Sequence, residues 1–237
     1  MSRVELTHAD RVLFPDDGIT KGDLFAYYER VAPVLVPHLR DRPFTMKRWR
    51  EGLAGGSFFQ KQAPKGIPDW IPTRQFQTFP REGGSRMVDF PLVNSADALL
   101  WMVQMHCIDM NAWYSRVDKP DRPDFVLFDL DPPDDGFALA VRVAHLIREA
   151  LESLELESYV KTSGADGIHV LVPIARPLLA LLQRLALESM KIPSVRTFED
   201  RERNERCACS DRFDAVVDGE EGESCQLFAR LIAVHES

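Results

Sequence analysis

The sequence predicts an α+β protein in which mixed or antiparallel sheets pack against helices. The prediction rests on residues 124–173. An apolar run at 125–128 is stopped by Pro132 and Pro133, as expected of a buried strand. A helix with one apolar stripe follows, and a glycine-rich turn at 163–167 then joins two further strands. This order of strand, helix, strand and strand predicts a sheet with helices on one face.

The N-terminal part predicts an extended segment, a helix and then short strands. Thr20 is placed to cap the helix, and Asp23 suits its first turn. Its apolar residues recur at helical spacing and are expected in the core: Leu24, Tyr27, Tyr28, Val31 and Leu35. Strands are predicted at residues 44–49, 57–61, 75–79 and 111–113. Ser95 is expected to cap a second helix that runs to His106.

The rest of the chain predicts a third helix and two strands. Asp134 or Asp135 caps this helix, which reaches about Leu154. Its expected buried stripe is Phe137, Val141, Ala144, Ile147 and Leu151. The following strands are predicted at 159–162 and 168–172. A further helix is expected at 177–190, whereas residues 199–224 are charge-rich with little periodicity and predict poor order.

Two aspartates at the end of the first of these strands are a candidate metal site. Asp129 and Asp131 are two residues apart, so on a strand they project to the same face. A divalent cation relieves the repulsion between neighbouring carboxylates, and Mg²⁺ and Mn²⁺ prefer such oxygen ligands. The alternative is a solvated strand end, which is the commoner meaning of an isolated Asp-x-Asp.

The glycine-rich turn is a candidate phosphate site. Gly164 and Gly167 allow positive φ and close backbone approach, so the turn is able to present N–H groups to phosphate oxygens. Ser163 and His169 add side-chain donors. The alternatives are an ordinary hairpin turn and a histidine satisfied within the core.

Taken together, these motifs resemble the polymerase domain of bacterial DNA ligase D, which belongs to the archaeo-eukaryotic primase superfamily. The first matching motif is Asp129-Leu-Asp131-Pro, and the second is Ser163-Gly164-x-x-Gly167-x-His169. The resemblance runs from about Val4 to about Ala175. It includes further short matches: Arg11-Val-Leu-Phe-Pro15, Thr20-Lys21, Lys47-Arg48-Trp49, Phe58-Phe59-Gln-Lys61 and Asn111-x-Trp113.

The resemblance implies a primase-polymerase-like core and nucleotidyl transfer from a nucleoside triphosphate to a primer 3′-hydroxyl. It assigns Asp129 and Asp131 to catalysis and metal binding, with Mn²⁺ favoured over Mg²⁺ and ribonucleotides preferred. The positions implied for nucleotide binding are Ser163, Gly164, Gly167, His169, Asn111 and Lys47. Many family members have histidine at position 111, and the asparagine here cannot carry a positive charge.

The same resemblance implies contacts with DNA gaps or ends. Arg11 and Lys21 occupy positions that grip a 5′-phosphate, and Phe58 and Phe59 occupy positions that pack against the template strand. Lys21 stands at a helix N-terminus, where the dipole disfavours a cation unless an anion binds nearby. Two surface cations and two core aromatics are the alternative interpretations. A ligase and end-binding repair proteins are the implied protein partners.

Two domains are predicted, an incomplete primase-polymerase-like domain at 1–175 and a divergent acidic tail at 176–237. The net charge is −8, and residues 199–237 hold eleven acidic and five basic residues. A candidate basic patch lies earlier in the chain: Arg40, Arg42, Lys47, Arg48 and Arg50. The family carries a third metal-binding aspartate, for which Asp218 is the nearest candidate and Asp214 a second.

Three functions therefore remain open from the sequence. The first is a polymerase of DNA-end repair, the second a catalytically impaired DNA-end-binding remnant, and the third a metal-dependent phosphohydrolase that uses the same aspartates. Hydrophobic residues make up 45% of the chain and charged residues 28%, as in ordinary globular proteins. No apolar run has the ~18–20 residues of a membrane span, and we expect a cytoplasmic protein without membrane association.

Overall fold

The computed structural model describes residues 3–79, 84–132, 136–164 and 167–174, and the backbone of two strands at 212–218 and 224–232. The chain divides into two compact units, one up to Asp118 and one from Lys119 onward. The predicted α+β class is confirmed, because three helices accompany sheets whose described strand pairs are all antiparallel. Among the described residues, no helix is long and apolar enough to cross a membrane.

The first unit begins with a short strand pair that leads into its longer helix. Strands β1 (Val12–Phe14) and β2 (Ile19–Thr20) pair before α1 (Lys21–Leu39). Thr20 is the N-cap, as predicted, and it forms a reciprocal capping box with Asp23. This box satisfies two backbone donors at the helix start, and it thereby fixes where Lys21 stands.

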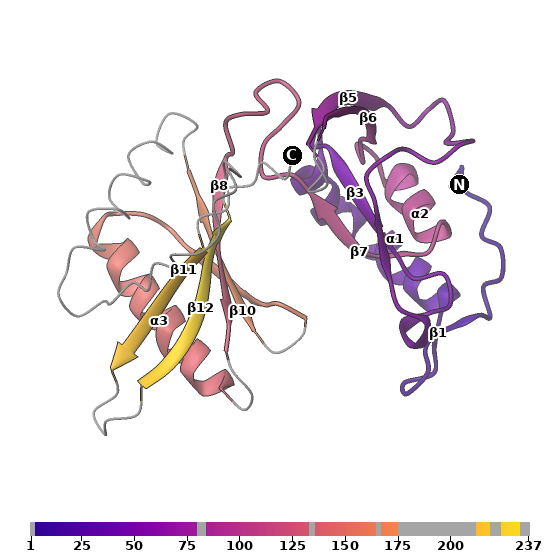
Figure 1. Ribbon diagram of the computed structural model, residues 1–237. Helices are drawn as coiled ribbons and strands as arrows, with labels where there is room; N and C mark the ends of the chain where they lie inside the picture. The colour runs from indigo at the N-terminus through magenta and orange to yellow at the C-terminus, as the bar shows by residue number, and fades with distance from the viewer. Residues whose placement is uncertain are drawn as a thin grey trace. The chain divides into compact units, whose positions relative to one another are not determined.

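Two helices cover one face of a three-stranded sheet in this unit (Figure 1). The sheet has the order β4 (Phe58–Gln60), β3 (Phe44–Arg48), β7 (Cys107–Ala112). Helix α2 (Ala96–Gln104) is capped by Ser95, as predicted, and packs against α1. The shared core contains residues from both helices and from the inner face of the sheet: Ala32, Val36, Phe44, Met46, Leu99 and Met102. A separate hairpin pairs β5 (Thr73–Thr78) with β6 (Arg86–Pro91).

The second unit is a five-stranded sheet with one helix packed on it. The strand order is β11 (Arg212–Asp218), β12 (Ser224–Ile232), β8 (Phe125–Asp131), β10 (Ile168–Pro173), β9 (Tyr159–Thr162). Helix α3 (Phe137–Ser153) lies beside this sheet in Figure 1. Leu130, Ile168 and Val170 pack against Ala140 and Val143 of the helix. Alternate residues of β8 therefore face the helix, and the residues between them face away from it.

The apolar stripes of the helices are turned slightly from the predicted positions. In α1 the buried residues include Ala32, Val36 and Leu39, while Tyr27 is 48% exposed, so its expected place in the core is wrong. In α3, Phe137 is likewise exposed, and the N-cap is Gly136, which supplies no side-chain bond. The predicted caps at 134–135 and the predicted helix at 177–190 lie outside the described residues.

Two strands after residue 211 were not predicted from the sequence. Strands β11 and β12 pair with each other, and β12 pairs with the central strand β8. The division into units falls between Asp118 and Lys119, and residues on both sides of position 175 supply strands to one sheet. The segment from 119 therefore forms one unit with the two late strands.

The capping box at the start of α1 gives a first testable expectation. Thr20→Ala removes the acceptor for the backbone N–H of Asp23 and one half of the box. We expect a loss of about 1 kcal/mol in the free energy of unfolding, measured by urea titration. Ser95→Ala, at the N-cap of α2, is a matched cap removal and should cost a similar amount. An unchanged urea midpoint for Thr20→Ala would contradict this role.

Candidate functional site

The two predicted metal ligands lie on the face of β8 that points away from α3. Asp129 and Asp131 alternate with the buried Leu130, so the expected arrangement of both carboxylates on one face is present. Across the strand pair, His169 of β10 is the register partner of Asp129. Its Nε2 lies 3.0 Å from Asp129 Oδ1, and the side chains are 21% and 16% exposed, respectively. The histidine is therefore fixed by a carboxylate rather than by the core.

The predicted glycine-rich turn brings its residues directly beside this pair. Ser163 Oγ accepts a hydrogen bond from the backbone N–H of Gly167 at 3.0 Å, and Ser163 N donates to Gly167 O. Gly164 has a φ of +95°, which disfavours other residues. A Cβ on Gly167 would lie 2.5 Å from Leu130 O and 3.1 Å from Asp131 Oδ1. Positive φ at Gly164 and close packing at Gly167 therefore explain why glycine occupies both positions. Gly167 packs against β8, the strand that carries Asp131.

The strand on the other side of β8 supplies no carboxylate at the matching positions. In the register of β12, Phe228 is opposite Asp131 and Arg230 is opposite Asp129. Asp214 of β11 is in turn opposite Phe228, two strands from Asp131. Neighbouring strands lie about 4.8 Å apart, which puts these two Cα positions roughly 10 Å apart. Asp218 is four residues further along β11, so Asp214 is the nearer candidate for a third carboxylate.

The donor set fits one hard divalent cation. Asp129 and Asp131 offer carboxylate oxygens from one face of one strand, which suits Mg²⁺ or Mn²⁺. Among the described side chains, no three histidine, cysteine, aspartate or glutamate residues come together as a metal site. The pair is thus the part of such a site that the described side chains provide.

In the first unit, Lys47 lies on the face of the three-stranded sheet opposite to the core. Its register partners are Phe59 on β4 and Asp109 on β7, so these three residues form one row across the sheet. Lys47 Nζ is 2.9 Å from Asp109 Oδ2 and 5.0 Å from the centre of the Trp49 ring. Asn111 is two residues beyond Asp109 on β7, so it shares this face, and its Nδ2 donates to Asp109 O.

The two adjacent phenylalanines of β4 have different neighbours. Phe59 is 64% exposed beside Lys47, while Phe58 is 39% exposed and lies against the guanidinium groups of Arg48 and Arg50. Both rings are too exposed to be core residues. They form an aromatic surface with cations beside it, and the bases of single-stranded nucleic acids stack on surfaces of this kind.

The predicted basic patch is smaller than the sequence indicated. Arg42 and Arg48 are 4% and 8% exposed, and each donates from Nε to a backbone carbonyl, His38 O and Met105 O. They serve the fold by satisfying buried acceptors and are not free surface charges. Their long side chains explain why a run of arginines in the sequence overstates the exposed charge.

Arg11 and Lys21 lie close together, although Lys21 is not at the surface. The Lys21 side chain is 0% exposed, and its Nζ donates to Thr7 O at 3.0 Å. Burial lowers the pKa of Lys21, and the nearby Arg11 lowers it further. Arg11 is partly exposed and paired with Glu51 at 2.9 Å.

His106 lies near Lys21 and Arg11, although it was not predicted as a site residue. Burial lowers its pKa to about 4, and Lys21, Arg11 and Arg48 add to the effect while Glu51 opposes it. Its φ is +64°, and its carbonyl accepts from Trp49 N. Nothing in the local sequence marks this position, because the cations come from distant segments.

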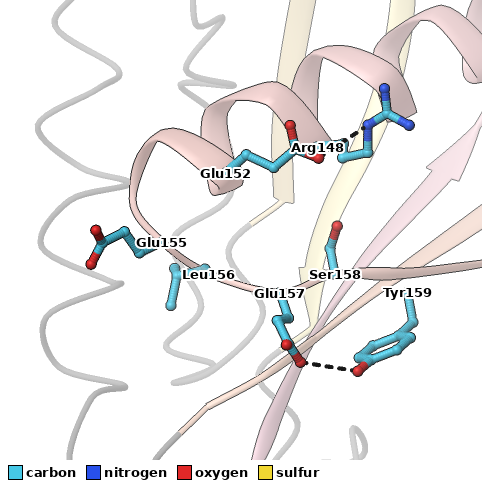
Figure 2. A pocket seen from close by; sticks show the side chains of 7 residues that line it. All are labelled: Arg148, Glu152, Glu155, Leu156, Glu157, Ser158 and Tyr159. Atoms are coloured by element: carbon cyan, nitrogen blue, oxygen red, sulfur yellow. Dashed lines mark hydrogen bonds and ion pairs between the residues drawn. The ribbon is translucent and has the colours of Figure 1, made fainter.

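A hollow of about 480 Å³ lies elsewhere in the second unit, between the end of α3 and the start of β9. Figure 2 shows its lining, in which Arg148 reaches toward Glu152 and Tyr159 donates to Glu157. None of the predicted site residues lines this hollow. It is acidic, so it is unsuited to a triphosphate.

Comparison with known proteins points to one family. The family model described as "LigD, primase-polymerase domain" matches residues 20–204. The match extends beyond residue 175, where the resemblance was expected to end. Among solved structures, the polymerase domain from Mycobacterium tuberculosis Ligase D, in complex with DNA, is 31% identical with a TM-score of 0.70. That match covers 84% of this chain and 74% of the other.

Curated relatives agree with this family. The multifunctional non-homologous end joining protein LigD of Mycolicibacterium smegmatis is 35% identical over 180 residues, which is 74% of this chain and 23% of that protein. The bifunctional non-homologous end joining protein LigD of Bacillus subtilis is 30% identical over 174 residues, 73% of this chain and 27% of that protein. The chain spans about a quarter of the length of these relatives.

The close approach at Gly167 predicts the effect of a single methyl group. In Gly167→Ala the new Cβ meets Leu130 O and the Asp131 carboxylate, and backbone atoms cannot swing aside. We expect a loss of about 1–3 kcal/mol in the free energy of unfolding, as for other overpacked sites. An unchanged urea midpoint for Gly167→Ala would contradict the packing argument.

The lowered pKa of His106 predicts a loss of stability in acid. The unfolded chain takes up the proton near pH 6.5 and the folded chain only near pH 4. The contribution of neutral His106 is therefore complete above about pH 6.5 and falls as the pH drops toward 4. His106→Asn, which tolerates the positive φ, should lose less stability than the wild type between about pH 7.5 and pH 5. Parallel losses in urea titrations at the two pH values would refute this expectation.

Proposed function

Since the chain belongs to the LigD primase-polymerase domain family, we propose that it adds nucleotides to a primer 3′-hydroxyl at DNA gaps or breaks that carry a 5′-phosphate. The observation that carries the proposal is the row formed by Asp129 and His169 beside Asp131 and the closed 163–167 turn. Carboxylates lie there on one face of one sheet, beside groups that can donate hydrogen bonds to phosphate oxygens. We infer a preference for ribonucleotides from the family resemblance.

In this proposal Asp129 and Asp131 hold Mn²⁺ or Mg²⁺. A bound divalent cation would lower the pKa of the attacking hydroxyl and offset the charge on the leaving oxygens. The neighbouring turn then binds the triphosphate through the backbone N–H of Gly164 and the side chains of Ser163 and His169, while the Gly167 N–H holds Ser163 Oγ in place. The pairing of His169 with Asp129 fixes the ring before substrate arrives, so less conformational freedom is lost on binding.

Binding of the DNA end is assigned to the first unit. Arg11 meets the 5′-phosphate at the surface, and buried Lys21 stabilises the anion by its charge. Lys21 Nζ has one acceptor among the described residues, which leaves its positive charge poorly compensated. This arrangement favours a nearby anion. Phe58 and Phe59 stack on the template, and Lys47 and Asn111 contact the nucleotide.

A second candidate function is end binding with impaired catalysis. The observation in its favour is the register of β12, which puts Phe228 and Arg230 opposite Asp131 and Asp129. A polymerase site with two cations normally has a bridging carboxylate in addition to one pair, and the strand next to β8 has none at those positions. In this case Asp214, two strands away, would have to supply it.

The partners of the chain are inferred from its relatives. Those proteins are named for non-homologous end joining, and the solved relative is a complex with DNA. We propose that this chain acts on DNA ends together with a ligase and end-binding repair proteins. We do not favour a phosphohydrolase that uses the same aspartates, because that function would leave the aromatic surface of the first unit without a role.

The phosphate role of Arg11 predicts a selective loss in DNA binding. Arg11→Gln should reduce the preference for a 5′-phosphorylated gap over a 5′-hydroxyl gap by about three- to tenfold. It should also lower the slope of the logarithm of the binding constant against the logarithm of the salt concentration by roughly one. Lys21→Met should reduce the same preference. Lys65→Met removes an exposed cation that has no assigned role and is the control. Equal wild-type affinity for the two gaps, measured by fluorescence anisotropy, would exclude the phosphate contact.

Gap filling distinguishes the two candidate functions. With Mn²⁺ and ribonucleoside triphosphates, the first predicts extension that falls by about 10²–10³-fold in Asp129→Ala, since one preorganised electrostatic element is lost. Asp69→Ala, an exposed carboxylate in the first unit, should have no effect. The second candidate predicts no extension while phosphate-dependent binding persists. Loss of extension in Asp214→Ala but not in Asp218→Ala would identify the third carboxylate.

A further inference from the structure

Asp109 occupies a central place on the open face of the three-stranded sheet in the first unit. It is the register partner of Lys47, which is in turn the partner of Phe59. The core lies on the opposite face, where Phe44 and Met46 are fully buried. Lys47 is 29% exposed and Asp109 is 44% exposed, so this row is open to a ligand.

One oxygen of Asp109 holds two side chains. Oδ2 is 2.9 Å from Lys47 Nζ and accepts a hydrogen bond from Trp49 Nε1 at 3.2 Å. The ammonium group is held 5.0 Å from the Trp49 ring centre and 5.9 Å from that of Phe59. A cation at these distances is attracted by the ring faces. A single carboxylate thus sets the position of a cation and of an aromatic donor together.

We propose that Asp109 is a positioning residue for the incoming nucleotide, which acts by presenting the Lys47 ammonium and the Trp49 indole in one arrangement. The inference rests on the proposed function, because it deepens the nucleotide contact assigned there to Lys47. A free lysine side chain has many rotamers, and fixing it in advance removes that entropic cost from nucleotide binding. The polyphosphate is the part of the nucleotide that the ammonium binds.

The opposite role for Asp109 would be competition with the polyphosphate for Lys47. The geometry favours positioning over competition. An ammonium has three N–H donors, and the carboxylate accepts one of them, so two remain for phosphate oxygens. The rings of Trp49 and Phe59 also hold the ammonium, so a phosphate need not displace Asp109 in order to reach it.

Two substitutions at one position separate these roles. Asp109→Asn keeps an oxygen acceptor for Lys47 and Trp49 but removes the charge, whereas Asp109→Ala removes both. Positioning predicts that Asp109→Ala weakens ATP binding by roughly tenfold and that Asp109→Asn restores most of it. Competition predicts that both variants bind ATP more tightly. The measurement is isothermal titration of the full chain with ATP in Mn²⁺, supported by KM and kcat in gap filling, where the KM should rise and kcat should change little.

Two further variants guard against an indirect effect. Asp89→Ala removes a carboxylate that also accepts from two side chains, Gln62 and Gln75, and it should leave ATP affinity unchanged. Trp49→Phe keeps a ring but removes the indole donor, and should weaken ATP binding by about threefold without altering the carboxylate. It also serves as the test if Asp109→Ala fails to fold.

A spectroscopic measurement tests the arrangement without activity. The chain has four tryptophans, and the indole N–H signal of Trp49 is identified by its absence in Trp49→Phe. That signal should move in Asp109→Ala, return toward its position in Asp109→Asn, and shift when inorganic triphosphate is added to the wild type. Tight ATP binding by the wild type with equal binding by Asp109→Ala would overturn the inference alone. No ATP binding by the wild type would instead overturn the nucleotide role in the proposed function and this inference with it.

Discussion

The alternation of side chains along two central strands is the constraint on which the rest of this structure depends. On β8, Leu130 packs against α3 while Asp129 and Asp131 face away from it. On β3, Met46 is in the core and Lys47 is on the open face. A register slip of one residue would bury the charges and expose the apolar residues, so the core and the chemistry are specified together. Each of the two strands therefore has one face in the core and one that carries charged side chains.

The cationic side chains of the first unit differ in the partners that compensate their charge. Lys47 and Arg11 are each paired with a carboxylate, and Arg42 and Arg48 are satisfied by backbone carbonyls. Lys21 differs, because it is fully buried and has one neutral acceptor. Burying a poorly compensated cation is costly for the fold, and the nearby Arg11 adds to that cost. Such a cost is tolerable where a bound anion offsets it.

Local signals in the sequence were sufficient for the parts of the structure built from neighbouring residues. Thr20 and Ser95 cap their helices, and Gly164 adopts the positive φ of its turn, since each of these features depends on a few adjacent residues. The role of Asp109 could not be found in this way, because Lys47 and Asp109 meet only through strand pairing. The pairing of β12 with β8 was missed for the same reason, because the two strands are far apart in the sequence.

Family membership and catalytic competence depend on different residues. The family is recognised from motifs on β8, β10 and the first unit, which this chain retains. The proposed catalysis would also need a further carboxylate, and in the register of β12 the positions opposite Asp131 and Asp129 are Phe228 and Arg230. The family's motifs are therefore present in a chain whose strand next to β8 has no carboxylate in register with Asp129 or Asp131, so gap filling, and not family membership, decides between the two candidate functions.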